Sequence, residues 1–192
     1  MNLTISLVYG SVRSERQGIR AAQYLHQKCR DRGLKVHFID PLQEKLPFLD
    51  KMYKEFNPGE APEPMQRLAG HFQASDGFLI VTGEYNHGLP PALKNILDHF
   101  QSEYLFKPSA IACYSAGRFG GVRAMVHLRE VVGELGMPAI SSILPFPSIA
   151  ESIDTEGSLL NERIDKHTDR FLDEFVWYME ALKVKRERGV PF

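Results

Sequence analysis

Short apolar runs alternate with helix-length amphipathic segments along most of this chain, and this alternation limits the folds that it can adopt. Each run is rich in apolar and β-branched residues and stops at a glycine, a proline or a polar loop, which is typical of buried strands. The runs span residues 3–9, 34–40, 77–82, 109–114 and 139–144. Five strands separated by helices predict an α/β fold with a parallel sheet and right-handed crossovers.

The segments between the runs have the spacing and the ends of helices. Residues 17–32 place apolar side chains from Ile19 to Cys29 at helical spacing, and Gly33 follows as a C-cap. The run at residues 77–82 (GFLIVT) is the most hydrophobic and suits a central strand covered on both faces. We expect four further helices, over residues 65–74, 90–102, 121–135 and 159–183.

This number of strands fits a three-layer sandwich with the flavodoxin-like strand order 2-1-3-4-5 and helices on both faces of the sheet. A length of 192 residues suits a single domain, residues 1–192. Repeated prolines interrupt residues 42–64, which predicts a surface excursion with short helical pieces. Sheets of this type bind ligands beyond the carboxyl ends of their strands, so the loops after the first, third and fourth strands matter most.

Charge and cysteine content exclude several classes of protein. A formal net charge of -1 provides no basic field for nucleic acid or an anionic membrane surface. No segment has the roughly 20 apolar residues of a membrane span, and residues 1–10 lack the basic start of a signal peptide. Cys29 and Cys113 form neither a C-x-x-C pair nor a metal motif, so we expect buried thiols, a cytoplasmic protein and no metal site.

The loop after the first strand, residues 10–18 (GSVRSERQG), has the features of a phosphate site. It leads into a helix N-terminus, whose free N–H groups and dipole favour an anion, and its serines and arginines add donors and positive charge. It matches neither the dinucleotide fingerprint nor the P-loop pattern. The alternative is a polar turn with solvated arginines.

Two later loops suit a planar ring. Residues 82–91 (TGEYNHGLPP) combine an aromatic, an amide, an imidazole and two glycines, although Tyr85 alone could pack on its neighbours and His87 alone could be an exposed histidine. Residues 115–121 (SAGRFGG) have three glycines that allow close backbone approach, and they are no nucleophile elbow, because Cys113 stands where that motif needs glycine. Together the three loops predict a mononucleotide with a large ring, most simply FMN.

The three motifs GSVRSERQG, EYNHGLPPALKNILDH and SAGRFGGVRA also resemble the NAD(P)H-dependent FMN reductase family in their order and spacing. The resemblance covers about residues 3–145. It implies a flavodoxin-like fold, noncovalent FMN, and the use of NADPH or NADH to reduce quinones, azo dyes, free flavins or metal oxyanions. The site residues that it implies are Ser11, Arg13, Arg16, Gln17 and Gly18 for the phosphate, Glu84, Tyr85, Asn86 and His87 for the ring, and Ser115, Ala116 and Gly117 for the other edge of the ring.

Two residues depart from the family pattern. Gly83 stands where the family usually has proline, and Pro91 stands where it often has alanine or glycine, so both affect the stiffness of the second loop. Lys94, Asn95 and Asp98 match the pattern, and we interpret them as residues that cap the helix and pack the loop.

With FMN bound, the cofactor supplies the redox chemistry, so we expect no obligatory catalytic side chain and a small-molecule electron acceptor as the partner. Reductases of this family are usually homodimers or homotetramers, and residues 42–64 either form such an interface or fold back onto the domain. Two alternatives are a flavodoxin-like electron carrier and a redox-sensing flavoprotein. The small net charge disfavours the carrier, because it gives little long-range steering toward partner proteins.

Overall fold

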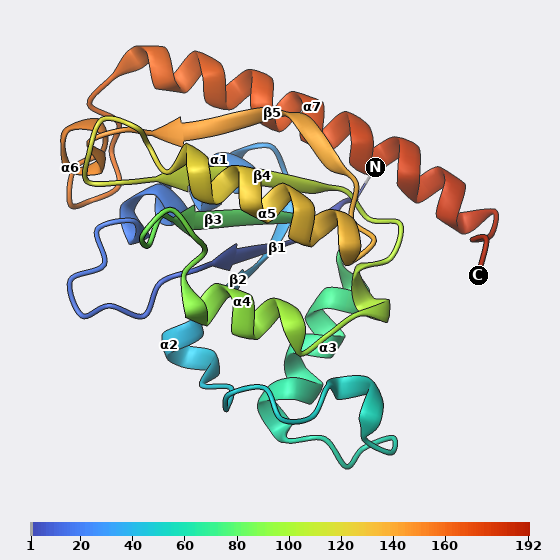
Figure 1. Cartoon of the computed structure of the whole chain (residues 1–192). Helices are drawn as coiled ribbons and strands as arrows, with labels where there is room; N and C mark the ends of the chain where they lie inside the picture. The colour runs from blue at the N-terminus through green and yellow to red at the C-terminus, as the bar shows by residue number, and fades with distance from the viewer. Residues whose placement is uncertain (1) are drawn as a thin grey trace.

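A five-stranded parallel sheet forms the centre of the molecule (Figure 1). The computed structural model describes residues 2–192. The strands are β1 (Thr4–Tyr9), β2 (Lys35–Ile39), β3 (Gly77–Gly83), β4 (Ser109–Tyr114) and β5 (Ala139–Phe146). They pair in the order β2-β1-β3-β4-β5, and all four pairings are parallel. The predicted flavodoxin-like strand order is therefore confirmed.

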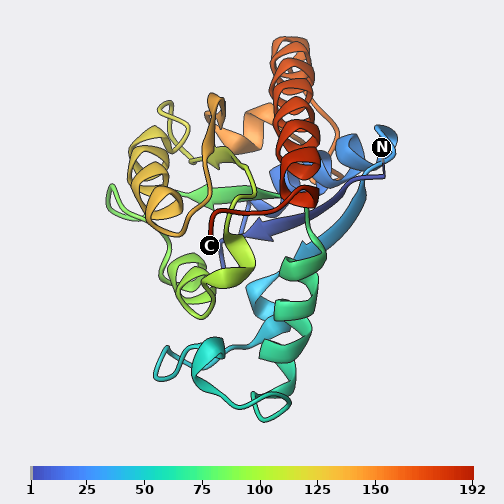
Figure 2. The same ribbon diagram turned by 90° about the vertical axis from the view of Figure 1, so that its right-hand side faces the viewer.

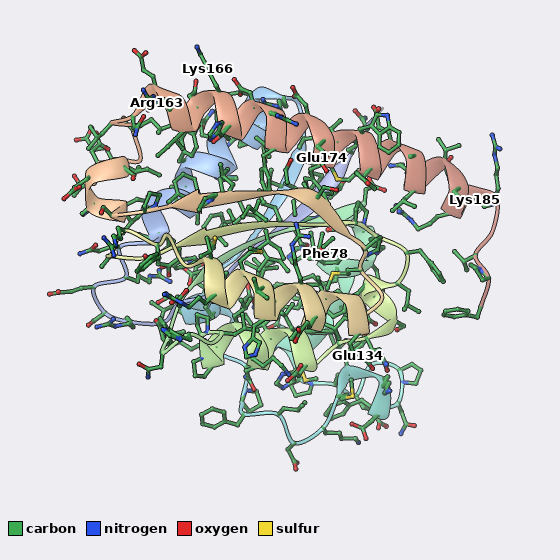
Figure 3. All side chains as sticks on the ribbon, turned by 45° about the horizontal axis from the view of Figure 1, so that its top comes forward. Phe78, Glu134, Arg163, Lys166, Glu174 and Lys185 are labelled. Atoms are coloured by element: carbon green, nitrogen blue, oxygen red, sulfur yellow. The ribbon has the colours of Figure 1, made fainter. Side chains whose placement is uncertain are left out.

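Helices cover both faces of the sheet, as predicted (Figure 1). One layer contains α1 (Ile19–Asp31) and α7 (Glu162–Glu187), and the other contains α3 (Glu63–Ala74), α4 (Pro91–Asp98) and α5 (Val122–Glu134). Each layer encloses its own apolar cluster against the sheet. Figure 3 shows the contrast between Phe78, which is buried under the α3–α5 layer, and Lys166, which points outward from α7. Strand β3 is buried along its whole length, as expected of a central strand.

Several predicted boundaries differ from the structure, and three elements illustrate this. The helix expected over residues 90–102 ends at Asp98, and the short helix η2 (Ser102–Tyr104) follows, because the Glu103 carboxylate accepts the Gln101 N–H (3.1 Å) in place of a further helical turn. Strand β5 runs on through Pro145, which an edge strand tolerates. The last helix begins three residues later than expected, after the Asn161 side chain caps it, and ends four residues later.

Residues 42–64 leave the sandwich at one end, and Figure 2 shows them below the sheet, beside the end of α3. The short helices α2 (Pro41–Glu44) and η1 (Tyr53–Glu55) confirm the predicted helical pieces. Asn95 of α4 holds this segment, because its side chain donates to Pro47 O (2.8 Å) and accepts from Leu49 N (3.0 Å). Part of the segment folds back onto the apolar cluster between the sheet and the layer of α3, α4 and α5, whereas Phe48 is 88% exposed.

Both cysteines are free and buried, as expected. Burial raises the pKa of each thiol, Cys29 and Cys113, to about 12, so neither is a thiolate at neutral pH. Residues 2–192 contain no helix with the length and apolar character that crossing a bilayer requires.

Candidate functional site

A cavity of about 370 Å³ opens at the carboxyl edge of the sheet, where β1, β3 and β4 lie side by side. All three predicted loops contribute to its lining. The predicted site residues that line it are Ser11, Arg13, Arg16, Gln17, Glu84, Tyr85, Ser115 and Ala116. Four more residues line it that were not among the predicted site residues: Glu15, Gly83, Tyr114 and Ile149 of the short helix α6 (Ile149–Ser152).

In the first loop, the two arginines differ in what they can offer an anion. The Arg16 guanidinium forms two hydrogen bonds with the Asp40 carboxylate (2.5 and 2.7 Å) and a third with Ser11 O (3.2 Å). Asp40 follows β2 and is only 3% exposed, and its hydrogen bonds raise the pKa of Arg16 further. Arg16 therefore anchors the loop with its charge neutralised, whereas the exposed Arg13 forms no ion pair in the described part of the chain.

The residues at the start of α1 continue this loop, and Gln17 among them lines the cavity. The N–H groups of Ile19 and Arg20 are taken by Arg16 O and Gln17 O (both 3.2 Å). Within residues 2–192, those of Gln17 and Gly18 have no hydrogen-bond partner. Unpaired N–H groups at a helix N-terminus are suited to a phosphate.

Gly18 itself is not part of the lining. A Cβ added to it would lie 1.9 Å from Cζ of Tyr114, so this position needs glycine for the close approach of the tyrosine ring. Its place in the motif is thus explained by packing.

The second loop is a tight hairpin. Tyr85 and Gly88 exchange two backbone hydrogen bonds (3.0 and 2.9 Å), and Asn86 and His87 between them both have positive φ (49° and 67°). Such a turn places its central residues at the tip, and both are exposed and outside the cavity lining. Of the predicted ring residues in this loop, only Glu84 and Tyr85 face the cavity.

Glu84 also joins this loop to the neighbouring helix. Its carboxylate accepts the N–H groups of Arg123 (3.1 Å) and Ala124 (3.4 Å) in the first turn of α5, and it pairs with the Arg123 guanidinium (3.3 Å). A carboxylate at a helix N-terminus is favoured by the helix dipole. The backbone of Glu84 and Tyr85 is therefore held at the rim of the cavity.

The third loop is fixed by its own backbone. Ser115 donates its N–H to Phe146 O (3.3 Å) and its hydroxyl to Gly117 O (2.8 Å), and Ser148 donates its N–H to the same Gly117 carbonyl (3.0 Å). Gly117 is exposed and outside the lining. In the described residues, the N–H groups of Ala116 and Gly117 have no hydrogen-bond partner, so they remain available as donors.

Hydroxyl groups gather along the side of the cavity that the β1 loop forms. Ser11 Oγ is hydrogen-bonded to the Tyr85 hydroxyl (2.8 Å), and Tyr114 donates its hydroxyl to that of Tyr9 (3.3 Å). Burial raises the pKa of both Tyr9 and Tyr114, so these hydroxyls stay protonated at neutral pH. No group of three or more His, Cys, Asp or Glu side chains in residues 2–192 is arranged to hold a metal ion.

Comparison with known protein sequences gives a consistent result. A family model described as NADPH-dependent FMN reductase matches residues 3–151. A quinone reductase of Pseudomonas putida is 28% identical over 184 residues, which cover 92% of this chain and 95% of that protein. A 2-hydroxy-1,4-benzoquinone reductase of a Burkholderia species is also 28% identical, over 96% of this chain and 100% of that protein.

Solved structures show the same likeness. FerB, a flavoenzyme NAD(P)H:(acceptor) oxidoreductase from Paracoccus denitrificans, superposes with a TM-score of 0.76 at 27% identity, over 93% of this chain and 98% of that one. A flavodoxin variant from Pseudomonas aeruginosa superposes with a TM-score of 0.56 at 17% identity, and it shares the fold.

Proposed function

Because the chain belongs to the NADPH-dependent FMN reductase family, we propose that it binds FMN in the cavity between the β1, β3 and β4 loops and reduces it with NAD(P)H. The observation that carries this proposal is the cavity itself. Its volume of about 370 Å³ lies in the usual range of small-molecule sites, and it opens at the edge of the sheet where this fold binds ligands.

The residues at the β1 end of the cavity suit the phosphate of FMN. The unpaired N–H groups of Gln17 and Gly18, the Ser11 hydroxyl and the free charge of Arg13 are all donors to an anion. Arg16 acts indirectly, since its bonds to Asp40 and Ser11 O hold the loop in shape.

The other end of the cavity suits the flavin ring. Tyr85 provides an aromatic wall, and Gly83 and the small residue Ala116 also line the cavity. The N–H groups of Ala116 and Gly117 can donate to negative charge that develops on the ring. FMN supplies the hydride chemistry when bound, and the chain supplies binding, orientation and hydrogen bonds.

We propose a quinone as the acceptor, because two relatives that match more than nine-tenths of the chain are named as quinone reductases. Azo dyes, free flavins and metal oxyanions are further candidates for the same assay. The proposed location is the cytoplasm, where NAD(P)H is regenerated and two free cysteines stay reduced.

The test is reconstitution of the purified protein with FMN, followed by anaerobic addition of NADPH and then of a quinone. We expect the flavin to be retained, its visible absorbance to bleach with NADPH, and the colour to return with the quinone. Retention without bleaching would instead indicate a carrier or a sensor, and loss of the flavin on a desalting column would contradict the whole proposal.

We further propose that the protein is a homodimer or homotetramer, with an interface over the excursion of residues 42–64. An apolar groove of about 450 Å³ lies between this segment and α4, lined by Val12, Leu46, Phe48 and Pro91 among others. Phe48 projects beside this groove and Leu42 and Leu49 are also exposed, which is an unusual concentration of apolar side chains on a surface.

Light scattering on two variants tests this interface. Phe48→Ser should shift the assembly to monomers, whereas Val126→Ser, which removes a 55% exposed side chain from α5, should leave it unchanged. A monomeric wild-type protein at micromolar concentration would contradict the interface.

A further inference from the structure

The ring of Tyr114 lies across the end of strand β3, and two glycines make room for it. A Cβ added to Gly83 would lie 3.0 Å from Cζ and from the hydroxyl oxygen of Tyr114, and one added to Gly18 would lie 1.9 Å from Cζ. These distances are shorter than normal contacts, so any side chain at either position must displace the ring. This accounts for glycine at position 83.

The hydroxyl of Tyr114 consequently reaches the β1 side of the sheet. It bonds to the Tyr9 hydroxyl (3.3 Å), and the tyrosine is one of the residues that line the cavity, together with Ser11 and Gln17 of the first loop. A hydroxyl rotates, so Tyr9 can donate to Tyr114 while Tyr114 donates to a ligand. The hydrogen bond from Tyr114 to Tyr9 is long for two hydroxyl groups, so Tyr114 loses little when it donates to a ligand in its place.

Tyr114 adds a neutral donor at a place where the nearest arginine is already paired. The Arg16 guanidinium lies 5.3 Å from the centre of the Tyr9 ring, and Asp40 occupies two of its donors. Burial keeps Tyr9 and Tyr114 protonated and able to donate.

We propose that Tyr114 is a specificity-determining residue for the cofactor, with a hydroxyl that donates to the phosphate end of FMN and so favours FMN over riboflavin. This rests on the proposed function, because it requires that the cavity binds FMN. Nothing in the three motifs indicates the role, since Tyr114 lies in strand β4 and reaches the phosphate loop only across Gly83.

Titration of the flavin-free protein with FMN and with riboflavin, followed by quenching of flavin fluorescence, tests the proposal. Tyr114→Phe keeps the ring and removes the hydroxyl. We expect its Kd for FMN to rise about tenfold, the value of one hydrogen bond to a charged group, while its Kd for riboflavin changes less than about twofold.

Tyr24→Phe is the matched control. Tyr24 and Tyr114 are both 8% exposed, and the Tyr24 hydroxyl bonds to Asp165 (2.8 Å) away from the cavity. Both Kd values of this variant should equal those of the wild type. If Tyr114→Phe binds FMN as the wild type does, or loses the same affinity for both flavins, the proposed role of Tyr114 is wrong but the proposed function stands. If the wild-type protein binds neither flavin, the proposed function is wrong as well.

Gly83→Ala supplies an independent test. Its Cβ should displace the Tyr114 hydroxyl and weaken FMN binding, and it should weaken binding much less when Tyr114→Phe is already present. Fully additive losses would contradict a role of Gly83 through the tyrosine hydroxyl. Equal thermal unfolding midpoints of these variants and the wild type would show that each remains folded.

Discussion

Gly18 shows how a residue in a binding motif can be selected by packing. It is the N-cap of α1 and carries one of the two unpaired N–H groups that suit a phosphate, yet it lies outside the cavity lining. The ring of Tyr114 occupies the space where a side chain would be. A change at Gly18 is therefore expected to affect ligand binding by displacing Tyr114.

Gly18→Ala should therefore destabilise the fold. Insertion of a methyl group into a packed site usually costs about 1–3 kcal/mol of unfolding free energy, and urea denaturation measures it. The control is Gly133→Ala in α5, where a Cβ would meet nothing within 4 Å, and this change should stabilise the protein by about 0.5–1 kcal/mol. Equal effects of the two substitutions would show that the tyrosine ring yields without cost.

At the scale of elements, a buried lysine completes the carboxyl end of α3. Lys107 precedes β4 and is 9% exposed, and its ammonium donates to Phe72 O (2.7 Å) and Gln73 O (3.0 Å). Phe72 O also accepts the N–H of the C-cap residue Ser75 (3.2 Å), and a cation is favoured at this end of a helix. Burial, with help from the nearby Arg186, lowers the pKa of Lys107 to about 8.

The depressed pKa of Lys107 predicts how stability depends on pH. The pKa of Lys107 is about 8 in the folded protein and has its ordinary value of 10.5 in the unfolded chain. Between these two values the amine is mostly neutral in the folded protein but still protonated in the unfolded chain. The unfolding free energy therefore increases as the pH rises through this range. From about pH 7.5 to about pH 9.5, the unfolding free energy of the wild type should rise by about 1–2 kcal/mol relative to Lys107→Met. Urea denaturation across this range measures the difference, and a constant difference would show that the buried amine keeps an ordinary pKa.

At the scale of the whole molecule, one carboxylate joins the last helix to the amino-terminal edge of the sheet. Asp76, just before β3, accepts from the Thr4 N–H (3.0 Å) and pairs with Lys183 (2.9 Å) and Arg186 (3.0 Å) of α7. Figure 1 shows α7 running along the face of the sheet that α1 also covers. Segments that are more than 100 residues apart in the chain thus meet at a single side chain.

Asp76→Asn should destabilise the protein by about 1–3 kcal/mol, since it leaves two half-buried cations without a charged partner. Asp173→Asn is the control, because Asp173 is 73% exposed and its contact with Arg32 is 3.6 Å long, so less than about 0.5 kcal/mol is expected. Thermal and urea unfolding measure both variants. A similar loss for the two would mean that the Asp76 cluster is no stronger than a surface pair.

Local pattern was enough to predict the elements, because apolar periodicity and turn residues act over a few residues. The strand order came instead from the type of fold that five alternating strands and helices fit. Local pattern was also enough to place the three loops at one edge of the sheet, since the carboxyl ends of parallel strands share that edge. Local pattern did not show where Asn86 and His87 lie, and the ring contacts that the resemblance implies for them stay a prediction. Two consecutive positive φ values turn them to the exposed tip of a hairpin.

The sequence by itself thus determined the sandwich, the family and the edge of the sheet where the three candidate loops meet. The tertiary structure alone decided that Asp40 neutralises Arg16 and that Tyr114 reaches across Gly83 to the loop after β1. The physical reason is that charge pairing and close packing depend on side chains from different strands. The pair of Arg16 with Asp40 joins residues 24 apart, and that of Tyr9 with Tyr114 joins residues 105 apart, so no local spacing encodes either contact.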